Sequence, residues 1–168
     1  LRQRRIIDPA FEGGRLRDAF PAIWAASEAA VARMATGEVE VELAASHAAA
    51  DVIFRTLFSL PIEDRVAQAV FQEFRSYQRS APILNLGAFI RLPPWVPRLH
   101  RGATRRSAKA IRRLIEGLTA RRAAAIADGT APDDLATKIM TTPDAETGAR
   151  FSTAEMVDQV AIFFLAGH

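Results

Sequence analysis

The last stretch of the sequence places the strongest constraint on the fold. Seven consecutive apolar or small residues, Ala161–Gly167, follow a capping box at Ser152-Thr-Ala-Glu155. In such a box the serine and glutamate side chains satisfy free backbone N–H groups at a helix start. The pattern predicts a final helix that is apolar on all sides near its end. Such a helix lies inside a larger protein, where its last carbonyl groups find partners.

The first residues behave in the same way. Leu1–Ile7 already follows a helical pattern, although no Met and no capping residue precede it. We therefore expect residues 1–168 to form a single partial domain, cut at both sides from a longer chain. One hydrophobic core is the ordinary expectation at this length.

Helical periodicity dominates the sequence between these ends, which predicts a mainly α fold. The expected helices cover residues 15–36, 45–60, 63–79, 102–128, 133–140 and a segment opened by the capping box. Within 45–60, the predicted buried stripe consists of Ala45, Ala48, Ala49, Val52, Ile53, Thr56, Leu57 and Leu60. Val39–Leu43 alternates with period two and predicts a short strand or an extended linker.

Residues 81–97 form an apolar segment whose second half contains three prolines, which prevent a regular helix there. Its apolar content is far above that of an ordinary surface loop. We expect it to pack onto a core or to form a mobile apolar lid, with Trp95 as a candidate anchor.

Cysteine is absent, which excludes disulfides, zinc–thiolate sites and a cysteine nucleophile within these residues. No apolar run approaches the roughly 18 residues of a membrane span, and no signal peptide is visible. The predicted location is therefore cytoplasmic. The three histidines, His47, His100 and His168, show no metal-ligand spacing, and His47 is expected to pair locally with Asp51.

The net charge is +3, and arginine greatly outnumbers lysine in clusters along the helices. Solvated helix faces explain such clusters, and a docking face for an acidic partner is the functional alternative. Nucleic acid binding is not expected, because the aromatic residues lie mostly on faces opposite the arginines.

Two segments, Leu1-Arg-Gln-Arg-Arg-Ile-Ile-Asp-Pro-Ala-Phe11 and Phe164-Leu-Ala-Gly-His168, together resemble the cytochrome P450 family of heme-thiolate monooxygenases. Leu1–Phe11, with Arg4, Pro9 and Phe11, is similar to the W-x-x-x-R…P-x-F pattern of that family's C helix. Phe164–His168 is similar to the start of the I-helix signature, [AG]-G-x-[DE]-T. The order and separation of the two segments suit the helical portion of that fold, from the C helix to the start of the I helix.

The resemblance implies a heme cofactor and gives several residues a role. Arg4 would pair with a heme propionate, while Ala166 and Gly167 would let the heme and O2 approach the backbone. A pocket for an apolar substrate would be bordered by Phe74, Tyr77, Phe163, Phe164 and Leu165. An electron-donor protein (ferredoxin, flavodoxin or reductase) would bind the basic face of Arg2 and Arg5.

The resemblance implies an enzyme that inserts one oxygen atom of O2 into an apolar organic substrate. Residues 1–168 lack the axial cysteine of the heme iron, and the acid–threonine pair would follow His168. This segment alone is therefore expected to be inactive. From the residues, a second class stays open: a helical ligand-binding and dimerisation module of a transcription regulator, although no helix-turn-helix is recognisable.

Overall fold

The structure, a computed structural model, describes residues 2–34, 37–80 and 102–167, and every regular element within these ranges is helical. The elements are α1 (Arg2–Ile7), the 3-10 helix η1 (Asp8–Ala10), α2 (Arg15–Met34), α3 (Val41–Phe58), α4 (Arg65–Ser80), α6 (Gly102–Ala127), α7 (Leu135–Thr141) and α8 (Thr153–Gly167). The predicted mainly α class is confirmed.

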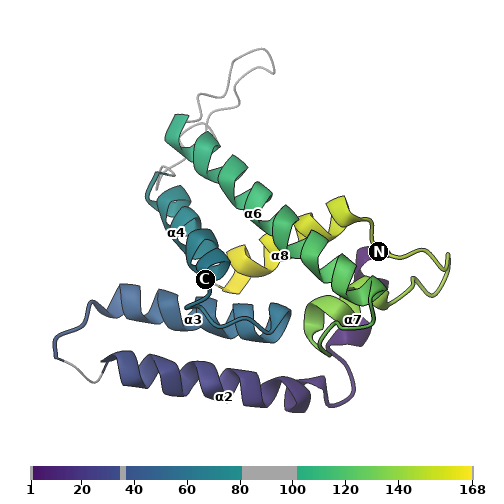
Figure 1. Ribbon diagram of the computed structural model, residues 1–168, viewed down its shortest axis with the longest axis horizontal. Helices are drawn as coiled ribbons and strands as arrows, with labels where there is room; N and C mark the ends of the chain where they lie inside the picture. Colours follow the sequence, from purple (N-terminus) through teal and green to yellow (C-terminus); the bar gives the residue numbers. More distant parts are fainter. Residues whose placement is uncertain (1, 35–36, 81–101, 168) are drawn as a thin grey trace, which may run out of the picture.

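Two antiparallel helix pairs organise the chain (Figure 1): α2 packs along α3, and α4 packs along α6. Helix α8 connects the pairs, because it contacts both α6 and α3. Its C-terminal end lies near the place where α3 and α4 meet, whereas its start lies near the N-terminal end of the chain (Figure 1).

One hydrophobic cluster holds these helices together. Its members come from α3, α4, α6, α7 and α8, with Ala10 of η1 and with Ile62 from the connection between α3 and α4. Its most deeply buried apolar residues include Phe54, Leu57, Ile62, Val70, Ile115, Ile139, Met156, Val157 and Val160. Every long helix except α2 buries apolar side chains in this cluster. The amphipathic patterns of the sequence therefore predict the helices well.

The predicted helix ends are mostly confirmed. The capping box forms as expected, because the Ser152 backbone N donates to Glu155 Oε2 at 2.9 Å and the Glu155 N donates to Ser152 Oγ at 3.3 Å. Helix α6 ends before Gly129, whose φ of +70° places it in the left-handed region that glycine adopts freely. Residues 35–36 and the predicted lid at 81–97, with Trp95, lie outside the described residues.

The sequence predicted either a short strand or an extended linker at Val39–Leu43, and the strand alternative is wrong. Glu40 has an extended backbone with φ −73° and ψ 104°, and α3 begins directly after it at Val41. The alternating residues therefore divide between a short extended linker and the first helical turn. A strand needs a neighbour for its backbone hydrogen bonds, and no other strand is present among the described residues.

The predicted stripe on α3 is also displaced. The buried residues are Ala50, Asp51, Phe54, Leu57 and Phe58, whereas Ala45 is exposed. Alanine is common on every side of this helix, so it marks no face clearly. The two phenylalanines bury far more apolar area than alanine does, and they decide which side turns inward.

A polar junction at the end of α3 links this helix to α6 and α7. Ser59 adopts a left-handed conformation with φ 55°, and its Oγ donates to Asp134 Oδ2 at 2.9 Å. The Arg122 guanidinium donates both to Asp134 at 2.6 Å and to the Phe58 carbonyl at 2.7 Å. Asp134 also caps α7, because its Oδ1 accepts from the Thr137 N at 3.0 Å.

Candidate functional site

Two arginines of α1 fix this helix on the segment that leads into α8. Arg2 pairs with Glu155 and donates to the Arg150 carbonyl at 3.0 Å. Arg5 holds the buried Asp144 carboxylate through two bonds of 2.6 and 3.1 Å. A bidentate guanidinium–carboxylate pair fixes orientation as well as distance. These contacts hold α1 against the start of α8 and against the segment that precedes it.

Lowering the pH is expected to weaken the attachment of α1 to the segment that leads into α8. The hydrogen bond from Arg5 lowers the pKa of Asp144 well below its usual range, with Thr147 adding to the effect. The backbone hydrogen bond at Ser152, followed by the bond from Arg2, lowers the pKa of Glu155 from 4.5 to about 2. Because both folded-state pKa values are depressed, both groups stabilise the fold above their unfolded-state pKa values. This stability is lost as the pH falls through the folded-state values.

We therefore expect the free energy of unfolding to fall as the pH drops from about 4.5 towards 2. Denaturant titrations of the full-length protein across this range measure the effect. The variant Glu155→Gln should flatten the dependence, whereas Glu116→Gln, in an exposed ion pair with Arg112, should leave it unchanged. The same dependence of the unfolding free energy on pH in the unchanged protein and in Glu155→Gln would contradict the stabilising role of Glu155.

Arg4 differs from its neighbours on α1. Its side chain is exposed, and it forms no ion pair with any residue in the described part of the chain. The short helix therefore presents one guanidinium to solvent while Arg2 and Arg5 are neutralised by internal carboxylates. An unpaired guanidinium is suited to bind a carboxylate from outside these residues.

The aromatic residues of α8 divide between the core and a more open side. Phe164 is 4% exposed and packs between Phe54 and Phe74, with ring centroids 4.6 and 5.4 Å away. Phe163 is half-buried and lies 6.0 Å from the exposed ring of Phe11, which follows η1. The end of α8 is thus in contact both with the core and with the segment that carries Arg4.

The opposite side of α8 is apolar and exposed. Ile162 and Leu165 are 53% and 54% exposed, and Ala166 follows them on the same side at helical spacing. Exposed large apolar residues at i and i+3 mark a surface suited to an apolar partner. The small side chain of Ala166 also permits a close approach to the helix backbone.

The structure thus separates the predicted site residues into two groups. Phe74 and Phe164 are in the core, and Tyr77 packs partly buried against it. Arg4, Leu165 and Ala166 are exposed, Phe163 is intermediate, and Gly167 is the last residue of α8. No single described cavity brings these residues together.

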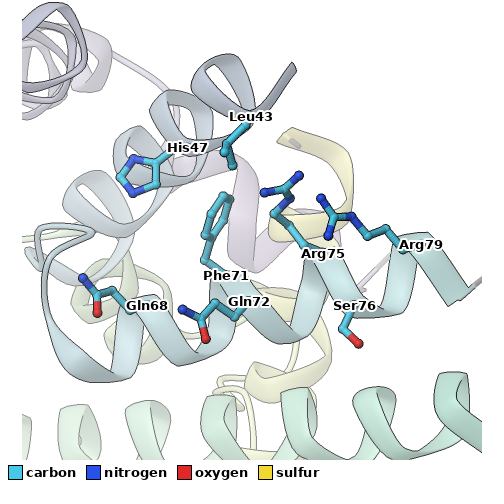
Figure 2. Close-up of a pocket in the computed structure, with 8 residues that line it drawn as sticks. All are labelled: Leu43, His47, Gln68, Phe71, Gln72, Arg75, Ser76 and Arg79. Atoms are coloured by element: carbon cyan, nitrogen blue, oxygen red, sulfur yellow. The ribbon is translucent and has the colours of Figure 1, made fainter. Parts of the chain in front are cut away.

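A groove of the structure is lined by residues that the sequence did not point to. It lies between α3 and α4 with a volume of about 690 Å3, and Figure 2 shows its lining residues. Its two cations, Arg75 and Arg79, are four residues apart on α4. That spacing is readable in the sequence, but the contribution of His47 from α3 depends on how the helices cross.

His47 does not form the predicted pair with Asp51. The Asp51 carboxylate instead accepts from Arg55 Nε at 2.8 Å and from the Ile62 backbone N at 2.9 Å. A guanidinium and a buried backbone N–H compete better for this carboxylate than an imidazole does. His47 turns to Phe71, with ring centroids 5.2 Å apart and an interplanar angle of 82°.

Among the described residues, no group of His, Cys, Asp or Glu side chains is arranged to hold a metal ion. Across the same residues, none of the helices combines the length and apolar character needed to cross a membrane.

Comparisons with known proteins agree with this architecture. The heme domain of cytochrome P450DA superposes with a TM-score of 0.72 at 20% identity, over 98% of this chain and 35% of that chain. A triple mutant of the same domain gives 0.74 at 20% identity, over 99% and 36%. A cytochrome P450 designated CYP102L1 gives 0.60 at 17% identity, over 99% and 38%.

The chain therefore spans about a third of the length of the solved structures that it resembles. A search of curated proteins finds no match. The sequence model described as Cytochrome P450 matches residues 2–168. This match covers nearly every residue, from the α1 segment with Arg4 to the end of α8. The chain belongs to the cytochrome P450 family.

Proposed function

We propose that this chain forms the part of a heme-thiolate monooxygenase that covers the heme and borders its substrate. The intact protein would insert one oxygen atom of O2 into an apolar organic substrate. The family match over residues 2–168 carries the proposal. It favours an enzyme over the ligand-binding module of a transcription regulator, the other class compatible with the sequence.

The described residues fit a heme. The group has a large apolar face and two carboxylates. The chain offers an exposed apolar surface on α8, at Ile162, Leu165 and Ala166, and an unpaired guanidinium at Arg4. A bound heme with a cysteine thiolate ligand supplies the activation of dioxygen. The cysteine is not among these 168 residues, so this segment alone is proposed to be inactive.

Each side chain then has a limited task. Arg4 holds a propionate carboxylate by charge-assisted hydrogen bonds. Ala166 and Gly167 leave space beside the α8 backbone. Phe163 and Leu165 form an apolar wall that binds an apolar substrate and excludes water. Phe74, Tyr77 and Phe164 support this wall from the core side, a proposal favoured by the Phe74–Phe164 contact.

The electron donor is proposed to bind at the basic face of Arg2 and Arg5. Both side chains are partly exposed, yet both already pair with carboxylates, Arg2 with Glu155 and Arg5 with Asp144 and Glu146. Because Arg4 is assigned to the heme propionate, the attraction for an acidic partner would depend on the part of the Arg2 and Arg5 charge that these carboxylates do not neutralise. A cytoplasmic location stays a prediction.

The test of the function uses the full-length protein loaded with heme. A carbon monoxide difference spectrum of the reduced protein reports whether a thiolate binds the iron. Isotopically labelled dioxygen, supplied with a reductase system and a panel of apolar compounds, should place one labelled oxygen in the product. Products without label, or a spectrum without thiolate ligation, would overturn the proposal.

Arg4 provides a sharper prediction. Replacing it with leucine should speed the loss of heme to a scavenger protein about tenfold, because one charge-assisted contact to a carboxylate is removed. Arg17→Leu is the matched control, since Arg17 is exposed on α2 and has no ion pair in the described part of the chain. Similar rates for the two variants would contradict the role of Arg4.

A further inference from the structure

Helix α1 is short, and its place in the fold depends on contacts outside it. It contains six residues, whereas isolated helices below about 12–15 residues are marginal in water. Ile6 is fully buried, and Arg2 and Arg5 form ion pairs with residues at or before the start of α8. Arg4 is exposed on the same helix and has no ion pair in the described part of the chain. The place of Arg4 is therefore set by what its neighbours bind.

The pair of Arg5 with Asp144 restrains α1 most strictly. The Asp144 side chain is fully buried, and both of its oxygens bind the same guanidinium. Arg5 Nε donates to Oδ1 at 2.6 Å, and Arg5 Nη2 donates to Oδ2 at 3.1 Å. Two such bonds fix the plane of the guanidinium as well as its distance. The pair therefore restrains the rotation of α1 about its own axis.

The Asp144 carboxylate is itself held in place by the turn on which it lies. Thr147 Oγ1 donates to Asp144 Oδ2 at 2.7 Å. The Asp144 N donates to the Ala149 carbonyl at 2.8 Å, and the Gly148 N donates back to the Asp144 carbonyl at 2.8 Å. The turn thus orients Asp144 independently of Arg5, and this carboxylate can act as a fixed point for α1.

The same turn leads into α8 and so links two parts of the proposed heme surface. The capping box at Ser152 opens α8, and its Glu155 pairs with Arg2. The exposed apolar residues Ile162 and Leu165 lie on later turns of the same helix. One continuous helix therefore joins the residues that hold α1 to the apolar surface proposed for the heme.

We propose that Asp144 is a positioning residue for heme binding. It holds Arg5, and thereby α1, so that Arg4 keeps a fixed place relative to the exposed side of α8. The inference rests on the proposed function, and it assigns to Asp144 an effect on heme retention that acts through Arg4.

A purely structural role of Asp144 is the alternative, because breaking any buried ion pair destabilises a fold. Asp134 provides the matched control. It is also a buried aspartate paired with an arginine, and its Oδ2 lies 2.6 Å from Arg122 on α6. Its other side-chain hydrogen bonds go to the end of α3 and to α7. Asp134→Asn therefore removes a comparable pair without breaking a contact of α1.

The experiment measures how fast the full-length heme protein loses heme to a scavenger protein. Asp144→Asn and Asp134→Asn are each compared in the unchanged protein and in the Arg4→Leu background. Arg5→Lys is a milder variant, which keeps the charge but loses the planar fork, so it tests the geometry if Asp144→Asn folds poorly. Denaturant unfolding and circular dichroism report the stability and helix content of every variant.

We expect Asp144→Asn to speed heme loss about fivefold, less than the roughly tenfold expected for Arg4→Leu, because Arg4 keeps its charge. Arg5→Lys should speed it about threefold. In the Arg4→Leu background neither variant should have a further effect, since changes that act through one contact do not add. Asp134→Asn should change the rate by the same factor in both backgrounds.

Three results would overturn the positioning role: equal factors for Asp144→Asn in the two backgrounds, an unchanged rate in Arg5→Lys, or heme loss that follows lost stability alike in both aspartate variants. Heme loss is measured without turnover. A protein that holds heme but gives additive effects therefore disproves only the role of Asp144, whereas a protein that binds no heme refutes the proposed function as well.

Discussion

Replacing Asp134 with alanine is expected to lower the free energy of unfolding by about 3–5 kcal/mol, the usual cost of removing one partner of a buried ion pair. The side chains of Asp134 and Arg122 are only 4% and 8% exposed. The change would leave the Arg122 charge without its carboxylate. It would also remove the acceptor of the Ser59 hydroxyl and the cap of α7 at Thr137.

The neighbouring Asp133 provides the control. Its side chain is 84% exposed, and its ion pair with Lys138 has an N–O distance of 3.5 Å. Asp133→Ala should therefore change stability little. Denaturant unfolding of the full-length protein, followed by circular dichroism, measures both variants. Adding Arg122→Met to Asp134→Ala should recover part of the loss, because no charge is then buried alone. A similar effect of both aspartate variants would refute the importance of this junction.

Phe164→Ala should also cost about 3–5 kcal/mol, because it opens a cavity between Phe54 and Phe74 in the middle of the core. The residue lies on α8 between the exposed Ile162 and Leu165, so a loss of activity in this variant alone would be ambiguous. A structural role predicts that stability falls first. Thermal and denaturant unfolding measure this fall before any turnover assay.

Leu165→Ala separates the two roles. Leu165 is adjacent in sequence but 54% exposed, so its replacement should change stability by less than about 0.5 kcal/mol. If α8 borders the substrate, this variant should raise the dissociation constant of an apolar substrate in the heme-loaded protein. Equal loss of stability in both variants would contradict the packing described for Phe164.

The sequence predicted the helices well because every long helix except α2 has an apolar face that is buried in the core. It was less reliable where that face is made of alanine. On α3 the predicted stripe included Ala45, which is exposed, and the observed one centres on Phe54 and Phe58. Alternation at Val39–Leu43 suggested a strand only because periodicity over five residues cannot distinguish a strand from a linker and one helical turn.

The candidate site was predictable only where it follows a local motif. Arg4 could be identified from its distance to Pro9, and the capping box identified the start of α8. The groove was not predictable, because His47 and Arg75 come together only through the crossing of α3 and α4. For the same reason, nothing in the sequence pairs Arg122 with Asp134 or brings the Ile62 N–H to Asp51. The pair of Asp51 with Arg55 is different, because its i, i+4 spacing within α3 can be read from the sequence.

The left-handed backbone and the hydroxyl bond of Ser59 together matter for any redesign of this domain. Design rules place glycine at a left-handed helix end, since glycine adopts positive φ without steric cost. Here the residue is a serine with φ 55°, whose hydroxyl is bonded to the carboxylate that caps α7. A consensus procedure guided by backbone angles alone would install glycine. It would thereby relieve a local strain while detaching the end of one helix from the beginning of another.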